Sequence, residues 1–443
     1  MKSAWYERPQ SRPESMQLVG SDVGERNRGG SAQYPQPLVP PANRPRLLVF
    51  NQYYWPGVEA TAHLLTELCE ALAEDYDVTV ITGRLHEHEL DPDYESRGGV
   101  EIVRVHSASY DRTRLHHRAI NYLTYVVRAL RRGLFEVDRP DLVLCMTDPP
   151  MVGDVALAVA RRFRARLVVV SQDVFPEIAV ELGRLTNPVL VRLLDVLTRL
   201  YLRRADAVVA IGETMKRRLE RKGVRPERVH VIPNWVDTTA VLPQERENPW
   251  AHAQGFDDRF VVMHSGNIGH AQDLDTLIRA STQLDDLQRL AVALVGFGAR
   301  HAEYVRMAEQ LRADKVIFLD YQPRELLPQS LSSADIHFVG LARGLSGYVV
   351  PSRLYGILAV SRPVIAAADE DSETAQLVRD VDCGIVIPPG EPGMLAEAIR
   401  AAAAGAFDLE AMGRRGRAWV EREADRVVAV ARYKQLLDDR LHQ

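Results

Sequence analysis

The segment from Val350 to Ile365 contains residues that could bind an anion. Ser352 is expected to cap a short helix, and Arg353 lies in the first turn of that helix, before a strand that begins near Pro363. Free N–H groups at a helix N-terminus and a guanidinium both bind phosphate groups well. The segment therefore predicts an anion site, and a solvated arginine on the helix surface is the alternative.

Three turns at the ends of predicted strands lie earlier in the same half of the chain, after 260–264, 290–295 and 316–319. Glycine in such a turn lets backbone N–H groups approach a phosphate, and the third turn could present backbone groups to a nucleobase. Each turn alone would be an ordinary tight turn, whereas three of them before the arginine-bearing helix indicate a nucleotide site. The candidate residues of this site are Gly266, Asn267, Gln272, Gly296, Tyr321, Gln322, Ser352, Arg353 and Leu354.

In the first half of the chain, a carboxylate follows a predicted strand. Asp173 stands next to two apolar residues, and such an acid could accept a proton from a hydroxyl or stabilise an oxocarbenium-like state. Asp173 and Arg353 are therefore the candidate catalytic residues. The alternatives are that Asp173 caps the following turn or that Glu177 takes its role.

Aromatic and basic residues of the first half are candidates for binding a second substrate. Tyr54 and Trp55 could stack on a sugar ring. Gly57, in the same turn, belongs instead with the candidate residues of the nucleotide site, because it would let the backbone approach a diphosphate or sugar. Arg114 and His117 lie just before a predicted helix whose apolar-aromatic face and basic edge suit an anionic membrane or a lipid-linked acceptor. The alternatives are aromatic rings that pack over a loop and an ordinary amphipathic helix with a solvated basic face.

The composition limits the functional classes. Of 443 residues, 46% are hydrophobic and 26% are charged, which is typical of a soluble protein of two or three domains. A net charge of −5 gives no reason to expect nucleic-acid binding. Three separated cysteines fit a reducing cytoplasm, and no spacing suggests a metal site, so neither a metal nor a cofactor is expected. No apolar run is long enough to span a bilayer, so membrane contact is expected to be peripheral, at the inner face of the cytoplasmic membrane.

Predicted strands and helices alternate through two successive halves, which predicts an α/β fold with two Rossmann-like, doubly wound sheets. Ligands bind at the carboxyl ends of the strands in such sheets, so the two domains are expected to face a cleft. The predicted parts are a disordered tail at 1–44, an N-terminal Rossmann-like domain at 45–237, a linker at 238–258, a C-terminal Rossmann-like domain at 259–415 and a C-terminal helix at 416–443 that packs back on the first domain.

The order of these features resembles the retaining GT-B glycosyltransferases of family 4 type, which include sucrose synthases and bacterial mannosyltransferases. Val229–Asp237 looks like the interdomain signature of that family, and Phe50–Leu72 resembles its first βα unit. The resemblance covers residues 46–440. Ser265–Gly269 together with Val350–Leu358 is most similar to a branch that builds bacterial O-antigens and exopolysaccharides, in which some members transfer fucosamine-type sugars to lipid-linked acceptors.

The sequence departs from this family at charged positions. Asn267 and Gln272 stand where the family has an arginine and a lysine, and Tyr348 and Gly356 stand where it has two glutamates. Amides can donate hydrogen bonds to a phosphate but cannot neutralise it. Arg353 would then carry most of the charge opposite a leaving diphosphate.

The resemblance implies that the C-terminal domain binds a nucleotide-diphosphate sugar, expected to be UDP-linked, and that the N-terminal domain binds the acceptor. The implied reaction transfers a hexosyl or N-acetylhexosaminyl group with retention to a saccharide or polyprenyl-diphosphate-linked saccharide, in cell-surface polysaccharide synthesis. One alternative is a UDP-sugar 2-epimerase of the same fold. The other is a non-catalytic glycosyltransferase-like subunit, because both family glutamates are missing.

Overall fold

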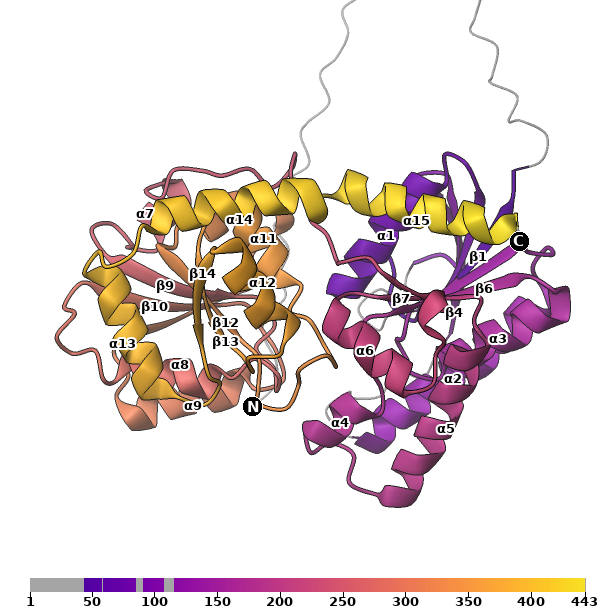
Figure 1. Cartoon of the computed structure of the whole chain (residues 1–443), viewed down its shortest axis with the longest axis horizontal. Coiled ribbons are helices and arrows are strands. Elements are labelled where there is room, and N and C mark those ends of the chain that lie inside the picture. The colour runs from indigo at the N-terminus through magenta and orange to yellow at the C-terminus, as the bar shows by residue number, and fades with distance from the viewer. Residues whose placement is uncertain (1–43, 58, 85–90, 107–114, 443) are drawn as a thin grey trace, which may run out of the picture. The chain divides into compact units, whose positions relative to one another are not determined.

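The computed structural model describes residues 44–57, 59–84, 91–106 and 115–442, without the side chains of 115–119. The predicted tail lies outside these residues except for Arg44, whose guanidinium donates to the Ala73 carbonyl. The described chain forms two parallel sheets, each flanked by helices (Figure 1). The predicted α/β fold with two Rossmann-like sheets is thereby confirmed.

The first sheet has eight strands in the order β3-β4-β2-β1-β5-β6-β7-β8, and only β3 runs antiparallel to its neighbour. Most strands are buried runs of Val, Leu and Ile, as expected where helices cover both faces of a parallel sheet. The strands are β1 Arg46–Phe50, β2 Asp77–Gly83, β3 Tyr94–Arg97, β4 Val100–Val105, β5 Leu142–Cys145, β6 Arg166–Ser171, β7 Ala207–Ala210 and β8 Val229–Val231.

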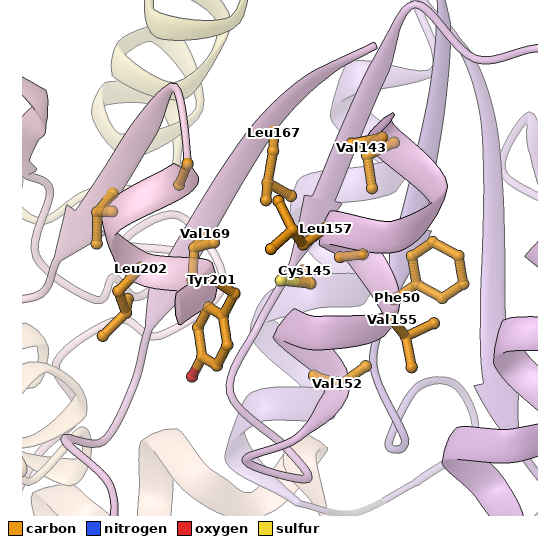
Figure 2. Close-up of a cluster of buried hydrophobic side chains, with 14 of the residues drawn as sticks. Phe50, Val143, Cys145, Val152, Val155, Leu157, Leu167, Val169, Tyr201 and Leu202 are labelled. Atoms are coloured by element: carbon orange, nitrogen blue, oxygen red, sulfur yellow. The ribbon is translucent and has the colours of Figure 1, made fainter. Parts of the chain in front are cut away.

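Helices cover both faces of the first sheet. On one face α2, α3 and α5 enclose a core that includes Phe50, Cys145 and Tyr201, with α3 lying over the strands (Figure 2). On the other face α1 packs together with α15, the last helix of the chain. The helices of this half are α1 Ala60–Leu72, α2 Leu115–Phe135, α3 Val152–Phe163, α4 Glu177–Glu181, α5 Pro188–Arg204 and α6 Glu213–Arg221.

The second sheet has six parallel strands in the order β11-β10-β9-β12-β13-β14. One face packs on α8, α9 and α13, and the other packs on α11 and α14. The strands are β9 Phe260–Ser265, β10 Leu290–Val295, β11 Val316–Leu319, β12 Ile336–Gly340, β13 Val364–Ala367 and β14 Gly384–Ile387. The helices are α7 Pro249–Ala253, α8 Leu274–Ser281, α9 His301–Leu311, α10 Leu327–Ser332, α11 Arg353–Ala359, α12 Glu373–Val381, α13 Pro392–Ala403, α14 Leu409–Glu423 and α15 Arg426–Leu441.

The chain crosses from one sheet to the other twice, first after β8 near Val236 and again between α14 and α15 near Asp425. These two crossing segments are hydrogen bonded to each other. The Val236 N–H donates to the Ala424 carbonyl at 3.1 Å, and the Arg426 N–H donates to the Val236 carbonyl at 3.0 Å. The Thr238 hydroxyl donates to the Asp425 carboxylate at 2.6 Å, and that carboxylate also caps α15. The predicted C-terminal helix at 416–443 is thus divided between the end of α14 and α15, because the chain pairs with the first crossing segment there, and α15 is the part that packs against the first sheet.

β3, α4, α7 and α12 were not predicted. β3 forms a short edge hairpin through Gly98 and Gly99, both of which have positive φ. α7 lies inside the predicted linker, but Trp250 and Phe256 are buried against the second sheet. The chain from Asn248 onward is thus part of the second α/β unit, because two buried aromatic rings hold this polar stretch against it.

Candidate functional site

Two glycine turns at the carboxyl ends of β9 and β10 pack backbone against backbone. The N–H groups of Gly266 and Gly296 donate to the carbonyls of Val295 and Leu319, each at 2.9 Å. Both glycines have positive φ, and a Cβ on Gly296 would lie 2.1 Å from the Gly266 carbonyl oxygen. Only glycine at position 296 permits this approach, so the sequence specifies where the two turns meet.

The loop after Gly266 holds the two amides that were predicted to contact a phosphate. The Gln272 carboxamide oxygen accepts a hydrogen bond from the Gly269 N–H at 3.0 Å, so this side chain closes its own loop. The Asn267 side chain lies against Gly298 at the end of β10, where a Cβ would be 2.5 Å from its oxygen. Asn267 is exposed, and Gln272 keeps its amide nitrogen as a donor for a ligand.

Arg353 lies beside the Gly266 turn. Its Nη2 donates to the Gly340 carbonyl at the end of β12 at 2.8 Å, and its Cδ is 3.7 Å from the position of a Cβ on Gly266. Nε is buried without a hydrogen-bond partner, and among the described residues no carboxylate forms an ion pair with this guanidinium. Burial lowers the pKa of Arg353 to about 10, which leaves it charged at neutral pH. A half-buried cation without a counter-ion is suited to an anionic ligand.

The residues around Arg353 differ from two predictions. Ser352 does not cap α11 with its side chain, because its own backbone is already helical at φ −61 and ψ −27. The Leu354 side chain is fully buried in the core, so only its backbone can face a ligand. Gly340 was missed, although it is a glycine at a strand end like Gly266 and Gly296, and the same rule would have found it.

The charge of Arg353 also acts on a buried, neutral histidine, His264. Burial and the nearby Arg353 charge hold the pKa of His264 well below its usual range. Its Nε2 lies 3.3 Å from the Asn267 carbonyl, and the residue is fully buried. His264 is therefore a core residue and not a ligand of the site.

Asp173 follows β6, and the main chain at this position is hydrogen bonded to the segment before α11, which belongs to the α/β unit of the second sheet. Asp173 forms an isolated antiparallel bridge with Val349, and the neighbouring Val174 N–H donates to the Tyr348 carbonyl at 2.9 Å. Burial raises the pKa of the Asp173 carboxyl to about 6. This carboxyl can therefore exist in both protonation states near neutral pH, which general acid–base catalysis requires.

Two residues near Asp173 are engaged elsewhere. Gln172 exchanges two hydrogen bonds with the Asn234 side chain at 2.9 and 3.1 Å. Both amides are buried, so they fix the segment that follows β8 against the end of β6. Glu177, the alternative to Asp173, forms an ion pair with Lys222 at 2.7 Å. Asp173 is thus the better placed of the two acids for chemistry.

The segment between β12 and α11 reaches into the first unit. Val350 is buried in the core formed by α2, α3 and α5, and Tyr348 packs against the same cluster. The Arg218 guanidinium lies over the Tyr348 ring at 4.4 Å. Tyr348 stands where the family has its first glutamate, so in this chain the position contributes packing between the two units. Gly356, at the position of the second glutamate, leaves space that reaches to Leu331, 3.5 Å from a Cβ.

The predicted acceptor residues separate into three groups. Tyr54 is buried in the core beside α1, so its ring cannot stack on a sugar, and that prediction is wrong because the turn folds inward. Trp55 is half-buried, and the Arg97 guanidinium covers its ring at 3.7 Å. Gly57, which was predicted to contact the donor and not the acceptor, is buried, and its N–H donates to the Tyr54 carbonyl at 2.7 Å. Arg114 and the side chain of His117 lie outside the described residues.

The turn after β11 exposes Tyr321, whereas Gln322 is engaged. The Gln322 carboxamide oxygen accepts from the Trp250 indole N–H at 2.8 Å, and its nitrogen donates to the Asp320 carbonyl at 2.8 Å. Tyr321 is therefore the freer of the two side chains to meet a ligand.

Over the residues that the structure describes, no three His, Cys, Asp or Glu side chains are grouped to hold a metal ion. Among the helices of those residues, none combines the length and apolar character that crossing a bilayer requires. A cavity of about 380 Å³ lies at the amino ends of β1, β2 and β4, on the edge of the first sheet opposite Asp173. Ligands of parallel α/β sheets bind at the carboxyl ends, so this cavity is separate from the candidate site.

Two sequence families match the chain in tandem. Residues 59–235 match the family described as Glycosyl transferase 4-like domain, and residues 247–419 match the family described as Glycosyl transferases group 1.

Two curated relatives match parts of the chain. Probable glycosyltransferase WbjE of Pseudomonas aeruginosa is 27% identical over 263 residues, covering 59% of this chain and 66% of WbjE. The Escherichia coli (strain K12) glycosyl transferase WcaI, whose name assigns it provisionally to colanic acid biosynthesis, is 31% identical over 186 residues, covering 40% of this chain and 44% of WcaI. The chain therefore spans less than two thirds of the length of either relative.

Solved structures share the arrangement of both domains. Anabaena Alr3699/HepE in complex with UDP and glucose has a TM-score of 0.70 at 17% identity and covers 89% of this chain and 99% of its own. Sucrose-phosphate synthase from Thermosynechococcus elongatus has a TM-score of 0.72 at 18% identity. WaaG, a glycosyltransferase involved in lipopolysaccharide biosynthesis, has a TM-score of 0.66 at 16% identity. They cover 89% and 88% of this chain and 99% and 98% of their own. At these identities the likeness establishes the GT-B fold.

Proposed function

We propose that this chain is a glycosyltransferase, which transfers a sugar from a UDP-linked donor to a saccharide acceptor with retention of the anomeric configuration. Its GT-B fold and its matches to the Glycosyl transferase 4-like domain and Glycosyl transferases group 1 families support this proposal. The transferred group is a hexosyl or N-acetylhexosaminyl unit. The acceptor is a saccharide carried on polyprenyl diphosphate, and the product enters a cell-surface polysaccharide. WbjE and WcaI, both named as glycosyltransferases, and the UDP bound to HepE support this choice of chemistry.

One observation carries the proposal. Arg353 is a half-buried cation beside the Gly266 turn and has no carboxylate partner among the described residues. A nucleotide diphosphate placed there would meet this guanidinium, the exposed Asn267 amide and the two strand-end turns. The same groups would stabilise the charge that develops on the leaving diphosphate as the glycosidic bond breaks.

Asp173 is the group that would receive the acceptor's proton. As the acceptor oxygen bonds to the anomeric carbon from the face that the diphosphate leaves, its hydroxyl proton passes to the Asp173 carboxylate or to the departing phosphate oxygen. Catalysis would depend on placing donor and acceptor together and on stabilising the leaving group.

The direct test is product analysis. The full chain is incubated with a panel of UDP-sugars, with and without polyprenyl-diphosphate-linked saccharides, and products are identified by mass spectrometry and NMR. Acceptor-dependent formation of an α-linked product from an α-linked UDP-sugar is the expected result. Interconversion of two UDP-sugars without acceptor would identify a 2-epimerase. Absence of turnover together with absence of UDP binding would identify a non-catalytic subunit.

A further inference from the structure

α5 exposes a stripe of apolar side chains. Val189, Leu193, Val196 and Leu200 are 78%, 54%, 57% and 39% exposed. Their spacing of four, three and four residues places them along one face of the helix. We call these four residues the α5 stripe. Single exposed apolar residues are ordinary on a protein surface, whereas a continuous line of four marks a binding surface.

The opposite face of α5 anchors the helix. Thr198, Tyr201 and Leu202 are buried, and the last two belong to the core cluster of the first sheet (Figure 2). The Tyr201 ring lies against Gly153 of α3. The stripe therefore points away from the core of the first unit. Asn187 caps the start of the helix through its side chain, with Pro188 at the first helical position.

Basic residues flank the α5 stripe on both sides. At 100° per residue, Arg192 and Arg203 lie on one side of the stripe and Arg204 lies on the other. The only acid in the sequence of α5 is Asp195, and it is neutralised by Lys222 at 2.8 Å. The surface of α5 is thus apolar at its centre and positive at both edges, in a chain whose net charge is −5.

α2 presents a smaller surface of the same kind. Ile120, Leu123 and Val127 are exposed at a spacing of three and four residues, and residues 115–135 contain no acid. α2 and α5 both pack against α3, so they belong to the same helical layer of the first sheet. The sequence pointed to α2 as a membrane contact, whereas α5 drew no such prediction.

We propose that the α5 stripe docks the protein on a bilayer that contains anionic lipids. The aliphatic side chains would enter the boundary between headgroups and acyl chains, and the flanking arginines would pair with lipid phosphates. Charge complementarity favours this occupant over a second copy of the chain, because two such surfaces would bring arginines together. The biological reason for docking rests on the proposed function, since a polyprenyl-linked acceptor lies in a membrane. Vesicle binding needs no catalysis, so the two proposals fail independently.

The test is sedimentation of the full chain with vesicles. Vesicles of phosphatidylcholine alone are compared with mixtures of phosphatidylcholine and phosphatidylglycerol, at low and high salt. The wild type is expected to bind the anionic vesicles preferentially, with affinity falling as salt rises. The double variant L193E/V196E is expected to lose at least about tenfold in affinity for these vesicles, because two charges would have to enter the membrane interface. R192Q/R204Q is expected to lose the preference for phosphatidylglycerol.

Two controls keep the result specific to α5. Val427→Glu places the same charge on α15, where Val427 is 67% exposed, and should leave vesicle binding unchanged. Circular dichroism and light scattering establish that each variant is folded and report its oligomeric state. The proposal is overturned if the wild type ignores anionic vesicles, if L193E/V196E binds as the wild type does, or if only L123E/V127E on α2 abolishes binding. A wild-type dimer that L193E/V196E converts to a monomer would likewise overturn it, since the stripe would then be a contact between copies.

Discussion

Asp173 and Val349 form a backbone bridge that joins the end of β6 to the segment before α11. Arg353 follows Val349 by four residues, so one short stretch of chain relates the candidate acid to the candidate cation. The bridge uses main-chain atoms, and the Arg353 side chain bonds to a main-chain carbonyl. Substitution of either side chain should therefore leave the connection between the two units in place.

Asp173→Asn is expected to lower kcat by about 100-fold or more, because an amide cannot accept the acceptor's proton. UDP affinity, measured by calorimetry, should change little, since the diphosphate is assigned to Arg353. Asp138→Asn is the matched control, because Asp138 is exposed at the opposite edge of the first sheet. Full transfer activity in Asp173→Asn would remove Asp173 from the mechanism.

The rate of transfer should also depend on pH through Asp173. Burial raises the pKa of this carboxyl from an ordinary value of 3.8 to about 6, and only the ionised form can act as a base. kcat/KM is expected to rise with pH through about 6 and then level off, and this rise should be absent in Asp173→Asn. The stability contribution runs the other way. The stabilisation that protonated Asp173 contributes is fully present below the pKa of this residue in the unfolded chain. It is lost as the pH rises through about 6, because ionisation leaves a charge in a buried place.

Arg353→Ala is expected to weaken UDP binding by about 10- to 100-fold, the effect of losing a charge-assisted hydrogen bond to an anion. Arg353→Lys should recover only part of the affinity, because an ammonium cannot hold Gly340 and a phosphate in the same planar geometry. Titration calorimetry with UDP measures both variants. Arg400→Ala is the control, since Arg400 is exposed and paired with Asp286 at 2.8 Å. If wild type and Arg353→Ala both bind UDP equally well, Arg353 is not the diphosphate cation.

The strand-end positions of the site could be predicted from the sequence because they obey a local rule. Gly266 and Gly296 end buried apolar strands, and parallel strands bring their carboxyl ends to one edge. Asp173 follows the same rule in the other sheet. Local patterns also predicted the alternation of strands and helices, because buried parallel strands and amphipathic helices have distinct periods.

Contacts between distant segments could not be predicted in this way. The pairing of Val236 with Asp425, which divides the last helices, depends on two passages of chain that meet only in the folded protein. The burial of Tyr54 and the packing of Tyr348 against the first unit are likewise set by tertiary contacts. Tyr54 looked available for a ligand because a single sequence shows which residues are aromatic, not what covers them.

Gly356 offers a test of the missing family glutamate. Gly356→Ala should raise the free energy of unfolding by about 0.5–1 kcal/mol, because glycine inside a helix costs backbone entropy. A Cβ there would make only an ordinary contact, 3.5 Å from Leu331 Cδ1. Denaturant titration measures the change. Gly296→Ala should instead destabilise the protein, since its Cβ would lie 2.1 Å from a carbonyl oxygen.

Gly356→Glu would return the carboxylate that the family has at this position. If the donor ribose passes this turn of α11, the variant should bind UDP more tightly than Gly356→Ala, because a carboxylate accepts hydrogen bonds from two ribose hydroxyls. Unchanged or weaker binding in calorimetry would show that the ribose lies elsewhere in this chain.

Asp154 should make stability depend on pH in a direction opposite to most acids. It lies in the first turn of α3, and its Oδ2 is buried without a hydrogen-bond partner. Burial raises its pKa from 3.8 to about 7. The folded state therefore holds this proton more tightly than the unfolded state, and the stability gained is full below the unfolded value and lost as pH rises through about 7.

The substituted side chain of Asp154→Asn carries no charge at any pH. The free energy of unfolding of this variant minus that of the wild type should therefore be larger at about pH 8 than at about pH 5. Denaturant titrations at both pH values measure this difference. Asp195→Asn is a control of opposite sign. Burial raises the pKa of Asp195, but hydrogen bonds from Lys222 and Arg199 outweigh that effect and lower it. Asp195→Asn should thus cost most stability at high pH, where the wild-type carboxylate is ionised and paired. If both variants shift in the same direction, burial does not set the charge of Asp154.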